Sequence, residues 1–557
     1  MPKNALIFTV LPLFEDDMTH SPAPSPSDYV PGSLTLSTAC TILRQHGLLK
    51  ELIHQDSWTD TPEIWPAETA GMTFTRISYD TRQVDDHTLL FCKGRFHSSY
   101  LDKADQDGLP CYVAENDYSQ VTRAIGIIVT DIKKAMSLLS SAFYRYPAKE
   151  ITVIGITGTK GKTTTAYFTH AILNAYTGGK AALLSSVDNC LDGHTFVESD
   201  LTTPESLDLF RMMRQAVSQG MKYLIMEVSS QAYKVDRVYG LTFALGAFLN
   251  ISPDHISPIE HPSFEDYFYC KRQIALNSSA LVLNADMVHS SLVTQDAGLR
   301  GIPVTTFRLE NSNADRTADL TVTSIREDKG ESPQFQARLK GKDLGRFSLS
   351  IPGDFNGANA AAALALISAC GLDLTNPHVQ QALQAMEKVT IAGRMEIFSS
   401  PDKSLVGIVD YAHNGVSASV LLDYIDQAYG RLNPRIILVT GSAGNKAYDR
   451  RQEIVEAAQN RISRFIFTEE DTDTEPIIDI CQQMDQAVSN PQVEHGIILS
   501  RSQALQEAFR DGKEHARQGK TTVIAAIGKG NERWIKHLNK HVVYQGDDRI
   551  MKGLLYD

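Results

Sequence analysis

Residues 151–165 read Ile-Thr-Val-Ile-Gly-Ile-Thr-Gly-Thr-Lys-Gly-Lys-Thr-Thr-Thr. Residues 151–156 are mostly apolar and β-branched, which is typical of a short buried strand. A glycine-containing turn follows at 158–163, and residues 164–176 then carry apolar side chains on one face of a predicted helix. Strand, turn and helix in this order predict a phosphate-binding loop, because free N–H groups at a helix N-terminus attract anions.

The loop contains the two side chains that such a site uses. Lys162 is placed to reach the terminal phosphates of a nucleotide, and the hydroxyl of Thr163 can bind Mg²⁺. A strict Walker A motif has glycine where this chain has Ile156, so the alternative is a glycine turn before an ordinary helix. The surrounding strand and helix favour the phosphate loop. The predicted ATP contacts are Gly158, Thr159, Lys160, Gly161, Lys162, Thr163 and Thr164.

Composition limits the possible partners of the chain. Its 557 residues are too many for one core, so two to four domains are expected. The net charge of −13 argues against nucleic acid as a main partner. The seven cysteines are scattered without a C-x-x-C pair, which suits a reducing cytoplasm and small buried side chains rather than disulfides or zinc.

The N-terminal 35 residues are predicted to be a loose extension, rich in Ser and Pro from 19 onward. Residues 5–14 could be the apolar part of a signal peptide, but only Lys3 precedes them and an acidic run follows. Met18 as the true start is the alternative interpretation. No later stretch reaches the roughly 18–20 apolar residues of a membrane span, so we expect no membrane insertion.

Strands and helices alternate along the rest of the chain and predict an α/β fold with three domains. The first domain is predicted at 36–149 and opens with a helix at 36–52. The second, at 150–390, should hold a parallel sheet built on the phosphate loop, with antiparallel strands within 319–351. The third, at 391–557, should be a doubly wound, Rossmann-like unit without a G-x-G-x-x-G motif.

Two polar residues follow buried strands of the second domain. Glu227 ends the apolar run 223–226, and His255 follows the strand predicted at 244–250. Because open α/β sheets bind ligands at the carboxyl ends of their strands, Glu227 is a candidate Mg²⁺ ligand. A strand-end charge in solvent and a structural histidine are the alternatives. Lys271, by position alone, would be an ordinary helix lysine.

These residues belong to longer motifs that closely resemble those of the Mur ligases of peptidoglycan synthesis. The resemblance runs from about residue 36 to the C-terminus and is to the members that add the third amino acid. The motifs are Thr-Gly-Thr-Lys-Gly-Lys-Thr-Thr (157–164), Leu-Thr-Thr-Pro-Glu-Ser (201–206), Met-Glu-Val-Ser-Ser-Gln-Ala-Tyr (226–233), Asn-Ile-Ser-Pro-Asp-His (250–255), Gly-Asp-Phe-Asn-Gly-Ala-Asn (353–359), Gly-Arg-Met-Glu (393–396), Asp-Tyr-Ala-His-Asn (410–414) and Gly-Lys-Gly-Asn-Glu (528–532).

The resemblance implies a role for each domain. The first would bind the UDP end of the substrate, the central P-loop sheet ATP, and the third the amino acid. Implied contacts to the UDP-muramoyl substrate are Tyr79, Thr81, Thr202, Thr203, Ser229 and Arg237. Further implied ATP contacts are Asn356, Asn359, Arg394, Asp410 and His413. Implied amino-acid contacts are Arg451, Glu470, Asp471, Thr472, Asp473, Gly528 and Glu532.

The resemblance also implies the catalytic group and the reaction. Lys162, Glu227, His255 and Lys271 would be catalytic. Thr163, Glu227, His255 and a carbamylated Lys271 would bind Mg²⁺, since carbamylation turns a repelling cation into a carboxylate. The implied reaction uses ATP to join L-lysine to the D-glutamate γ-carboxylate of UDP-MurNAc-L-Ala-D-Glu through an acyl phosphate. We expect a cytoplasmic monomer.

The stretch at 470–473 bears on which amino acid is added. Family members that add diaminopimelate carry Asp-Asn-Pro-Arg there, and this chain has Glu-Asp-Thr-Asp, so Asp473 replaces the arginine. A carboxylate suits a distal ammonium, as in L-lysine or L-ornithine, and opposes a distal carboxylate. Lysine-adding members have Asp-Asp-Pro-Asn, so Thr472 is a departure. A solvated acidic run without a role in specificity is the alternative.

Other functions remain open at this point. Meso-diaminopimelate as the added amino acid is one, and the related folylpolyglutamate synthases, also ATP-dependent amide ligases, are another. A catalytically silent nucleotide-binding relative of the same fold is a third. The predicted first domain and Thr202-Thr203-Pro204-Glu205 favour the muramoyl substrate. The intact Lys162, Glu227, His255 and Lys271 argue against a silent relative.

Overall fold

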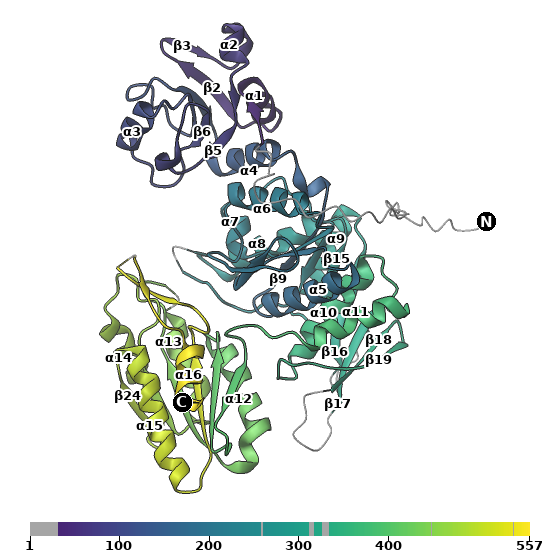
Figure 1. Cartoon of the computed structure of the whole chain (residues 1–557), viewed down its shortest axis with the longest axis vertical. Coiled ribbons are helices and arrows are strands. Elements are labelled where there is room, and N and C mark those ends of the chain that lie inside the picture. The colour runs from purple at the N-terminus through teal and green to yellow at the C-terminus, as the bar shows by residue number, and fades with distance from the viewer. Residues whose placement is uncertain are drawn as a thin grey trace, which may run out of the picture.

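The computed structural model describes residues 32–257, 260–310, 317–325, 334–446, 448–538 and 540–556. These residues form three α/β domains that follow one another along the long axis of the molecule (Figure 1). The expected three-domain α/β architecture is therefore confirmed. Most of the predicted N-terminal extension, Met18 included, lies outside the described residues.

The N-terminal domain is a six-stranded sheet in the order β3-β2-β8-β7-β6-β5, at the top of Figure 1. Strands β5 to β8 run parallel, and β2 joins β8 antiparallel. A separate two-stranded pair joins β1 (Leu34–Thr35), just upstream of the boundary predicted at 36, to β4 (Thr73–Phe74). The other elements are α1 (Leu36–Gln45), β2 (Leu49–His54), β3 (Ser57–Thr59), α2 (Ala67–Ala70), β5 (Arg76–Ser78), β6 (Thr88–Phe91), α3 (Leu101–Gln106), β7 (Cys111–Ala114), β8 (Ile125–Val129) and α4 (Ile132–Phe143).

The helix predicted at 36–52 is wrong in its second half. Gly47 adopts a left-handed conformation, φ 65°, after helix α1. Its N–H donates to Arg44 O (3.0 Å), and Leu48 N donates to Leu43 O (2.8 Å), which closes the helix. The next residues extend as β2 and pair with β8, whose side chains are buried. Tertiary pairing thus overrides the helical pattern in the sequence.

The central domain is an eleven-stranded sheet with β9 (Thr152–Thr157) near its middle. The predicted parallel arrangement holds from β10 through β13, β9, β14, β15 and β16 to β17, and antiparallel strands flank it at both edges. The strands are β10 (Ala181–Leu184), β11 (Asp188–Cys190), β12 (Phe196–Glu198), β13 (Tyr223–Glu227), β14 (Leu245–Phe248), β15 (Leu281–Asn284), β16 (Val304–Glu310), β17 (Leu320–Ile325), β18 (Gln334–Leu339) and β19 (Lys342–Ser348).

Helices cover both faces of this sheet. Helix α10 is rich in alanine and buried almost all round, so it can pack closely beside α5 and the sheet. This packing fixes the N-terminus of α5, and with it the phosphate loop, against the sheet. The helices are α5 (Lys162–Tyr176), α6 (Ser206–Ser218), α7 (Ser230–Lys234), α8 (Phe264–Leu276), α9 (Ser290–Arg300), α10 (Asn356–Ala369) and α11 (Pro377–Glu387).

The C-terminal domain is a six-stranded sheet in the order β20-β21-β25-β22-β23-β24, parallel except for β20. A two-stranded hairpin, β26 with β27, stands apart from it. The elements are β20 (Glu396–Ser399), β21 (Leu405–Asp410), α12 (Gly415–Tyr429), β22 (Arg435–Thr440), α13 (Asp449–Ala458), β23 (Arg464–Phe467), α14 (Ile477–Gln486), β24 (Glu494–Ile497), α15 (Arg501–Arg517), β25 (Thr522–Ile527), β26 (Trp534–His537), β27 (Lys540–Val543) and α16 (Asp547–Tyr556).

The seven cysteines are free thiols, six of them buried and Cys370 partly so. Within the described part of the chain, no helix has the length and apolarity needed to cross a bilayer.

A buried ion pair ties the last helix to the C-terminal sheet. Arg501 and Asp547 are both fully buried and joined by two hydrogen bonds of 2.8 and 2.7 Å. The guanidinium also donates to Ile527 O (2.6 Å), and Tyr544 OH donates to Asp547 (2.6 Å). Removing one partner of such a pair leaves an uncompensated buried charge.

Replacing Arg501 with Gln is therefore expected to destabilise the C-terminal domain by about 3–5 kcal/mol. Urea unfolding, followed by far-UV circular dichroism, measures the change. The matched control is Arg517→Gln, since Arg517 is exposed and pairs with the exposed Glu514, and a change under about 0.5 kcal/mol is expected there. Equal midpoints for the two variants would contradict the prediction.

Candidate active site

The phosphate loop joins β9 to α5 and forms as predicted. Gly161 has φ 82°, and a Cβ there would lie 2.2 Å from Asn359 Oδ1, so both backbone and space require glycine. Asn359 thus lies against the loop from α10, and its Nδ2 donates to Asn356 Oδ1 (2.9 Å). The structure brings these two asparagines, predicted as ATP contacts, beside the loop.

Two lysines converge on one carbonyl of this loop. Lys162 Nζ donates to Gly158 O (3.0 Å) and Thr159 O (3.2 Å), while Lys271 Nζ, from α8, donates to Gly158 O (2.8 Å). Burial, followed by repulsion from Lys162, lowers the pKa of Lys271 well below its ordinary value. Burial also lowers the pKa of Lys162. Lys271 is therefore an active-site neighbour of Lys162 rather than a solvated helix lysine.

A chain of oxygen atoms crosses the carboxyl ends of three neighbouring strands. Thr163 Oγ1 lies 3.1 Å from Ser186 Oγ, and Ser186 donates to Glu227 Oε1 from its N–H (2.8 Å) and its hydroxyl (3.2 Å). Glu227 is 1 % exposed, so it is not a strand-end charge in solvent. Hydroxyl and carboxylate oxygens are ligands that suit Mg²⁺.

Ser186 is a site residue that the sequence analysis missed. It follows β10 (Ala181–Leu184), just as Glu227 ends β13 and His255 follows β14. Applying the strand-end rule to every predicted parallel strand could have found it.

His255 lies outside this oxygen chain. It adopts φ 58°, its ring is partly exposed, and its Nδ1 lies 3.1 Å from Glu260 Oε1. A nearby group, His261, Asp266 and Cys270, has the residue types of a metal site. Its polar atoms are already engaged, because His261 bonds Asp266 and Ser230, and the Lys234 ammonium lies 2.6 Å from Asp266. We assign it no metal.

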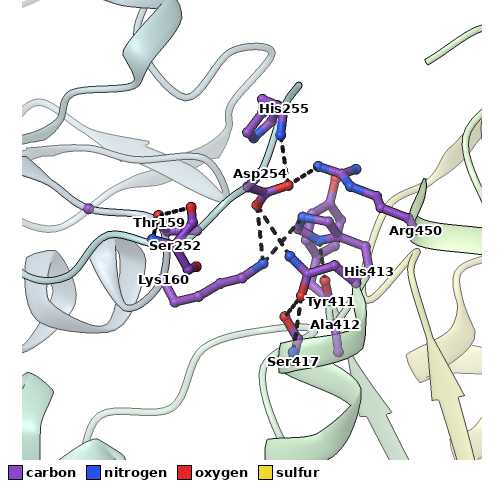
Figure 2. Close-up of polar contacts among 12 residues, drawn as sticks. Thr159, Lys160, Ser252, Asp254, His255, Tyr411, Ala412, His413, Ser417 and Arg450 are labelled. Atoms are coloured by element: carbon purple, nitrogen blue, oxygen red, sulfur yellow. Dashed lines mark hydrogen bonds and ion pairs between the residues drawn. The ribbon is translucent and has the colours of Figure 1, made fainter. Parts of the chain in front are cut away.

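The central and C-terminal domains meet at the carboxylate of Asp254. Figure 2 shows Lys160 and Arg450 reaching it from different sides, Lys160 from the phosphate loop and Arg450 from α13. Burial opposes ionisation of this carboxyl, but the charges of Lys160 and Arg450 hold its pKa far below the usual range. Asp254 is therefore a buried anion shared by two domains.

The hydrogen bonds of His413 fix its tautomer (Figure 2). Its Nδ1 lies 2.8 Å from Tyr411 O, and a carbonyl only accepts, so the proton is on Nδ1. Nε2 then faces Lys160 Nζ at 3.5 Å with its lone pair. Burial and the charges of Lys160 and Arg450 lower the pKa of His413 well below its ordinary value, which keeps it neutral.

Asp410 and Arg394 lie beside this junction. Asp410 accepts from Met395 N and Ala412 N, both at 2.8 Å, and burial raises its pKa although Arg394 opposes the shift. The Arg394 guanidinium lies 4.7 Å from the centre of the Tyr411 ring. The C-terminal residues predicted as ATP contacts thus gather opposite the phosphate loop.

Two of the residues predicted for the UDP-substrate, Tyr79 and Arg237, lie at the junction of the first two domains. Tyr79 OH donates to Asp208 on α6 (2.6 Å), and Arg237 pairs with Glu205 (2.6 Å). Lys93, which sequence reasoning missed, also pairs with Glu205 (2.6 Å). Of the others, Thr203 Oγ1 donates to Glu227 O (3.0 Å) and accepts from Ser229 N, Ser229 caps α7, Thr81 begins a short 3₁₀ turn, and Thr202 lies in the turn before α6.

The residues predicted to hold the amino acid lie in two different settings. Arg451 is buried and held by Glu475 (2.7 Å) and Gln483 (2.6 Å) inside its own domain. The second setting is a cluster around the buried Lys529, whose ammonium pairs with Asp471 (2.8 Å) and Glu532. Tyr411 OH also donates to Glu532 (2.8 Å), and Glu470 is buried beside Gly528.

The acidic stretch at 470–473 is covered by the β26–β27 hairpin, so it is not a run of charges in solvent. Asp473 pairs with Lys536 Nζ through Oδ2 (3.4 Å), and His537 bonds both Thr472 (2.9 Å) and Glu469 (3.0 Å). Asp473 Oδ1 is buried, with no hydrogen-bond partner among the residues that the structure describes. Asp473 thus has one carboxylate oxygen paired with Lys536 and one without a partner in the described part of the chain.

Two family profiles match most of the chain beyond the first domain. The profile described as "Mur ligase middle domain" covers residues 156–367, and "Mur ligase, glutamate ligase domain" covers residues 393–530.

Whole-length relatives and a solved structure agree with these profiles. The chain is 57% identical over 523 residues to the UDP-N-acetylmuramyl-tripeptide synthetase of Bifidobacterium longum, covering 94% of this chain and 99% of that protein. It is 41% identical to the UDP-N-acetylmuramoyl-L-alanyl-D-glutamate–L-lysine ligase of Enterococcus faecalis, covering 92% and 97%. The solved UDP-N-acetylmuramoyl-L-alanyl-D-glutamate–2,6-diaminopimelate ligase shares the fold, with TM-score 0.56, 20% identity and coverage of 86% and 94%.

Proposed function

The chain belongs to the Mur ligase family, and from that premise we propose that it joins L-lysine to the D-glutamate γ-carboxylate of UDP-MurNAc-L-Ala-D-Glu, using ATP, in peptidoglycan precursor synthesis. The relatives named above are a tripeptide synthetase and a lysine ligase, and each aligns over more than nine-tenths of this chain. That extent includes the N-terminal domain, which supports a muramoyl substrate over a folyl one.

The observation that carries the proposal is the convergence of ATP-handling groups on the phosphate loop. Lys162 and Lys271 meet at Gly158, and Thr163 leads through Ser186 to the buried Glu227. A silent nucleotide-binding relative would have no need of two desolvated amines and a buried carboxylate at this point. The arrangement supports an active ligase.

The oxygen atoms of Thr163, Ser186 and Glu227 fit a hard divalent cation, and we propose that they would hold Mg²⁺. When bound, Mg²⁺ would neutralise charge on the ATP phosphates. His255 and a carbamylated Lys271 are proposed to complete the metal environment. The oxygen-rich donor set, free of thiolates, suits Mg²⁺ better than a soft metal.

The proposed reaction has two steps. A γ-carboxylate oxygen of D-glutamate attacks the γ-phosphorus of ATP, the bond to the β–γ bridging oxygen breaks, and ADP leaves. The amine of the incoming amino acid then attacks the acyl carbon, the carbon–oxygen bond to phosphate breaks, and the amine loses a proton. Lys162 and Lys160 offset negative charge on the transferring phosphoryl group. The neutral His413, with its Nε2 lone pair toward Lys160, orients that ammonium.

The three domains would divide the substrates among them. We propose residues 36–149 for the UDP end, 150–390 for ATP and 391–557 for the amino acid. The ion pairs of Lys93 and Arg237 with Glu205 would hold the first junction in place for the substrate. We propose that the chain acts as a monomer. We place it in the cytoplasm, because a UDP-linked precursor and ATP are both available there.

Asp473 supports a dibasic amino acid. Its Oδ1 has no hydrogen-bond partner among the described residues, and a carboxylate there would accept the distal ammonium of lysine or ornithine. A distal carboxylate, as in meso-diaminopimelate, would be repelled. We favour L-lysine because the E. faecalis relative is named for it, and L-ornithine is the second candidate.

Phosphate release tests the function directly. With ATP, Mg²⁺ and UDP-MurNAc-L-Ala-D-Glu, the chain is expected to release phosphate when L-lysine is added. The rate with meso-diaminopimelate should be at least about 100-fold lower, since a buried like-charge contact costs several kcal/mol.

The controls separate the alternatives. Phosphate release with ornithine alone would support the ligase function but make L-ornithine, rather than L-lysine, the added amino acid. Equal or faster release with diaminopimelate would overturn the role of Asp473. No release with any of the three amino acids, despite ATP binding, would favour the silent relative.

A further inference from the structure

Arg450 makes the closest polar contact between the central and C-terminal domains in Figure 2. It lies on α13, only 8 % exposed, and its NH2 donates to Asp254 Oδ1 at 2.5 Å. Its Nε–H is buried without a hydrogen-bond partner in the described ranges. Asp254 is therefore the group that orients this guanidinium.

The second oxygen of Asp254 serves other residues. Asn414 Nδ2, at the start of α12, donates to Oδ2 at 3.3 Å, and Lys160 Nζ of the phosphate loop lies 3.6 Å from the same atom. One carboxylate thus contacts the phosphate loop on one side and two elements of the C-terminal domain on the other. The backbone N–H of His255 also donates to Oδ1 (3.0 Å), which fixes the carboxylate plane.

We propose that Arg450 is a positioning residue, which acts through Asp254 to orient Lys160 when the C-terminal domain docks. The inference rests on the proposed ligase function and deepens it, because it states how docking of the amino-acid domain reaches the phosphate loop. Arg450 neutralises one oxygen of Asp254, so the carboxylate can hold Lys160 loosely through the other. Without Arg450, Lys160 would face the full charge of the carboxylate.

Stability alone is a poor explanation for this pair. Desolvating an arginine and an aspartate inside a protein costs about as much as their attraction returns. The pair instead fixes a direction, because a guanidinium has rigid planar donors and each oxygen of the carboxylate has its own partners. Oδ1 accepts from Arg450 and from the His255 N–H, and Oδ2 faces Lys160 and Asn414. A misplacement of about 1 Å at a reacting group can lower the rate about 100-fold.

A double-mutant cycle tests the inference in the full-length chain. The variants are Arg450→Met, Asp254→Asn and the double variant, with Arg450→Gln as a second variant if Arg450→Met lowers the melting temperature. The control is Arg461→Gln. Arg461 follows the C-terminal end of α13 and pairs with Asp423 and Asp426 inside its own domain. Readouts are kcat and KM for each substrate, and ATP affinity by calorimetry.

Arg450→Met is expected to lower kcat about 100-fold while KM for ATP changes less than about threefold. The double variant should match Asp254→Asn within about threefold, because Arg450 acts through that carboxylate. Arg461→Gln should retain wild-type kcat. ATP affinity should be unchanged in Arg450→Met.

Two results would overturn the inference. Wild-type kcat in both Arg450→Met and Arg450→Gln would remove any role for the arginine. Additive losses in the double variant would mean that Arg450 acts independently of Asp254. A wild-type chain that binds ATP but ligates none of the three amino acids would instead defeat the proposed function, which is a different outcome.

Discussion

Replacing Lys162 with methionine is expected to lower kcat by about 10³-fold, a typical loss when one group that stabilises developing charge is removed. Lys162 Nζ is held at the loop by Gly158 O and Thr159 O, a position from which it can turn to a phosphate. Methionine keeps the length of the side chain and removes the charge. Single-turnover phosphate release with saturating substrates measures the change in the chemical step.

The control is Lys180→Met, because Lys180 is exposed on the turn beyond the same helix. It should leave kcat unchanged. A Lys162→Met variant that keeps a tenth or more of wild-type kcat would contradict the role of Lys162. ATP affinity should fall less than kcat, since interactions made in the transition state affect kcat most strongly.

Local signals in the sequence were sufficient for most of the fold. Strands β9, β13 and β14 lie within two residues of the runs predicted at 151–156, 223–226 and 244–250, because each is a short apolar run between clear turns. The helix predicted at 36–52 failed because Gly47 ends it and the following residues join a sheet whose partner, β8, lies about eighty residues away in sequence.

A site residue could be predicted where a single local rule applied to a single strand or turn. The strand-end rule found Glu227, and the glycine turn found Lys162. Ser186 obeys the same rule but was passed over. The resemblance, rather than any local pattern, drew attention to Lys271, and its proximity to Lys162 emerged only from the packing of α8.

Contacts between domains had no signal in the sequence. Arg450 and Asp254 are 196 positions apart, and the pairing depends on how two separately folded sheets dock. The same is true of Lys93 with Glu205, 112 positions apart. Arg451 is a case in which a motif makes a prediction that the contacts do not reflect. The motif predicts that Arg451 binds the amino acid, but in the structure its guanidinium is held by Glu475.

Lys271→Ala is the second variant with a large expected effect, and it separates two chemical states of the lysine. Buried beside Lys162, Lys271 has a pKa well below that of a free lysine, so its neutral fraction at neutral pH is raised. A neutral amine can add CO₂ to give a carbamate, and acidification opposes this by protonating the amine. Activity should therefore fall as pH is lowered through that depressed pKa.

If the carbamate is the working form, Lys271→Ala should lose about 10³-fold in kcat, and acetate or propionate should restore part of it by returning a carboxylate to the vacated space. Lys271→Arg, which keeps a positive charge, should be as inactive as Lys271→Ala and gain nothing from the acids. Lys162→Met supplies the control, because the acids cannot replace a cation. Activity retained in Lys271→Arg would mean that Lys271 works as a plain ammonium group. No recovery of Lys271→Ala with either acid would contradict the carbamate. A ¹³C-bicarbonate-labelled carbamate signal in the wild-type chain, absent from Lys271→Ala, distinguishes the two states without relying on activity.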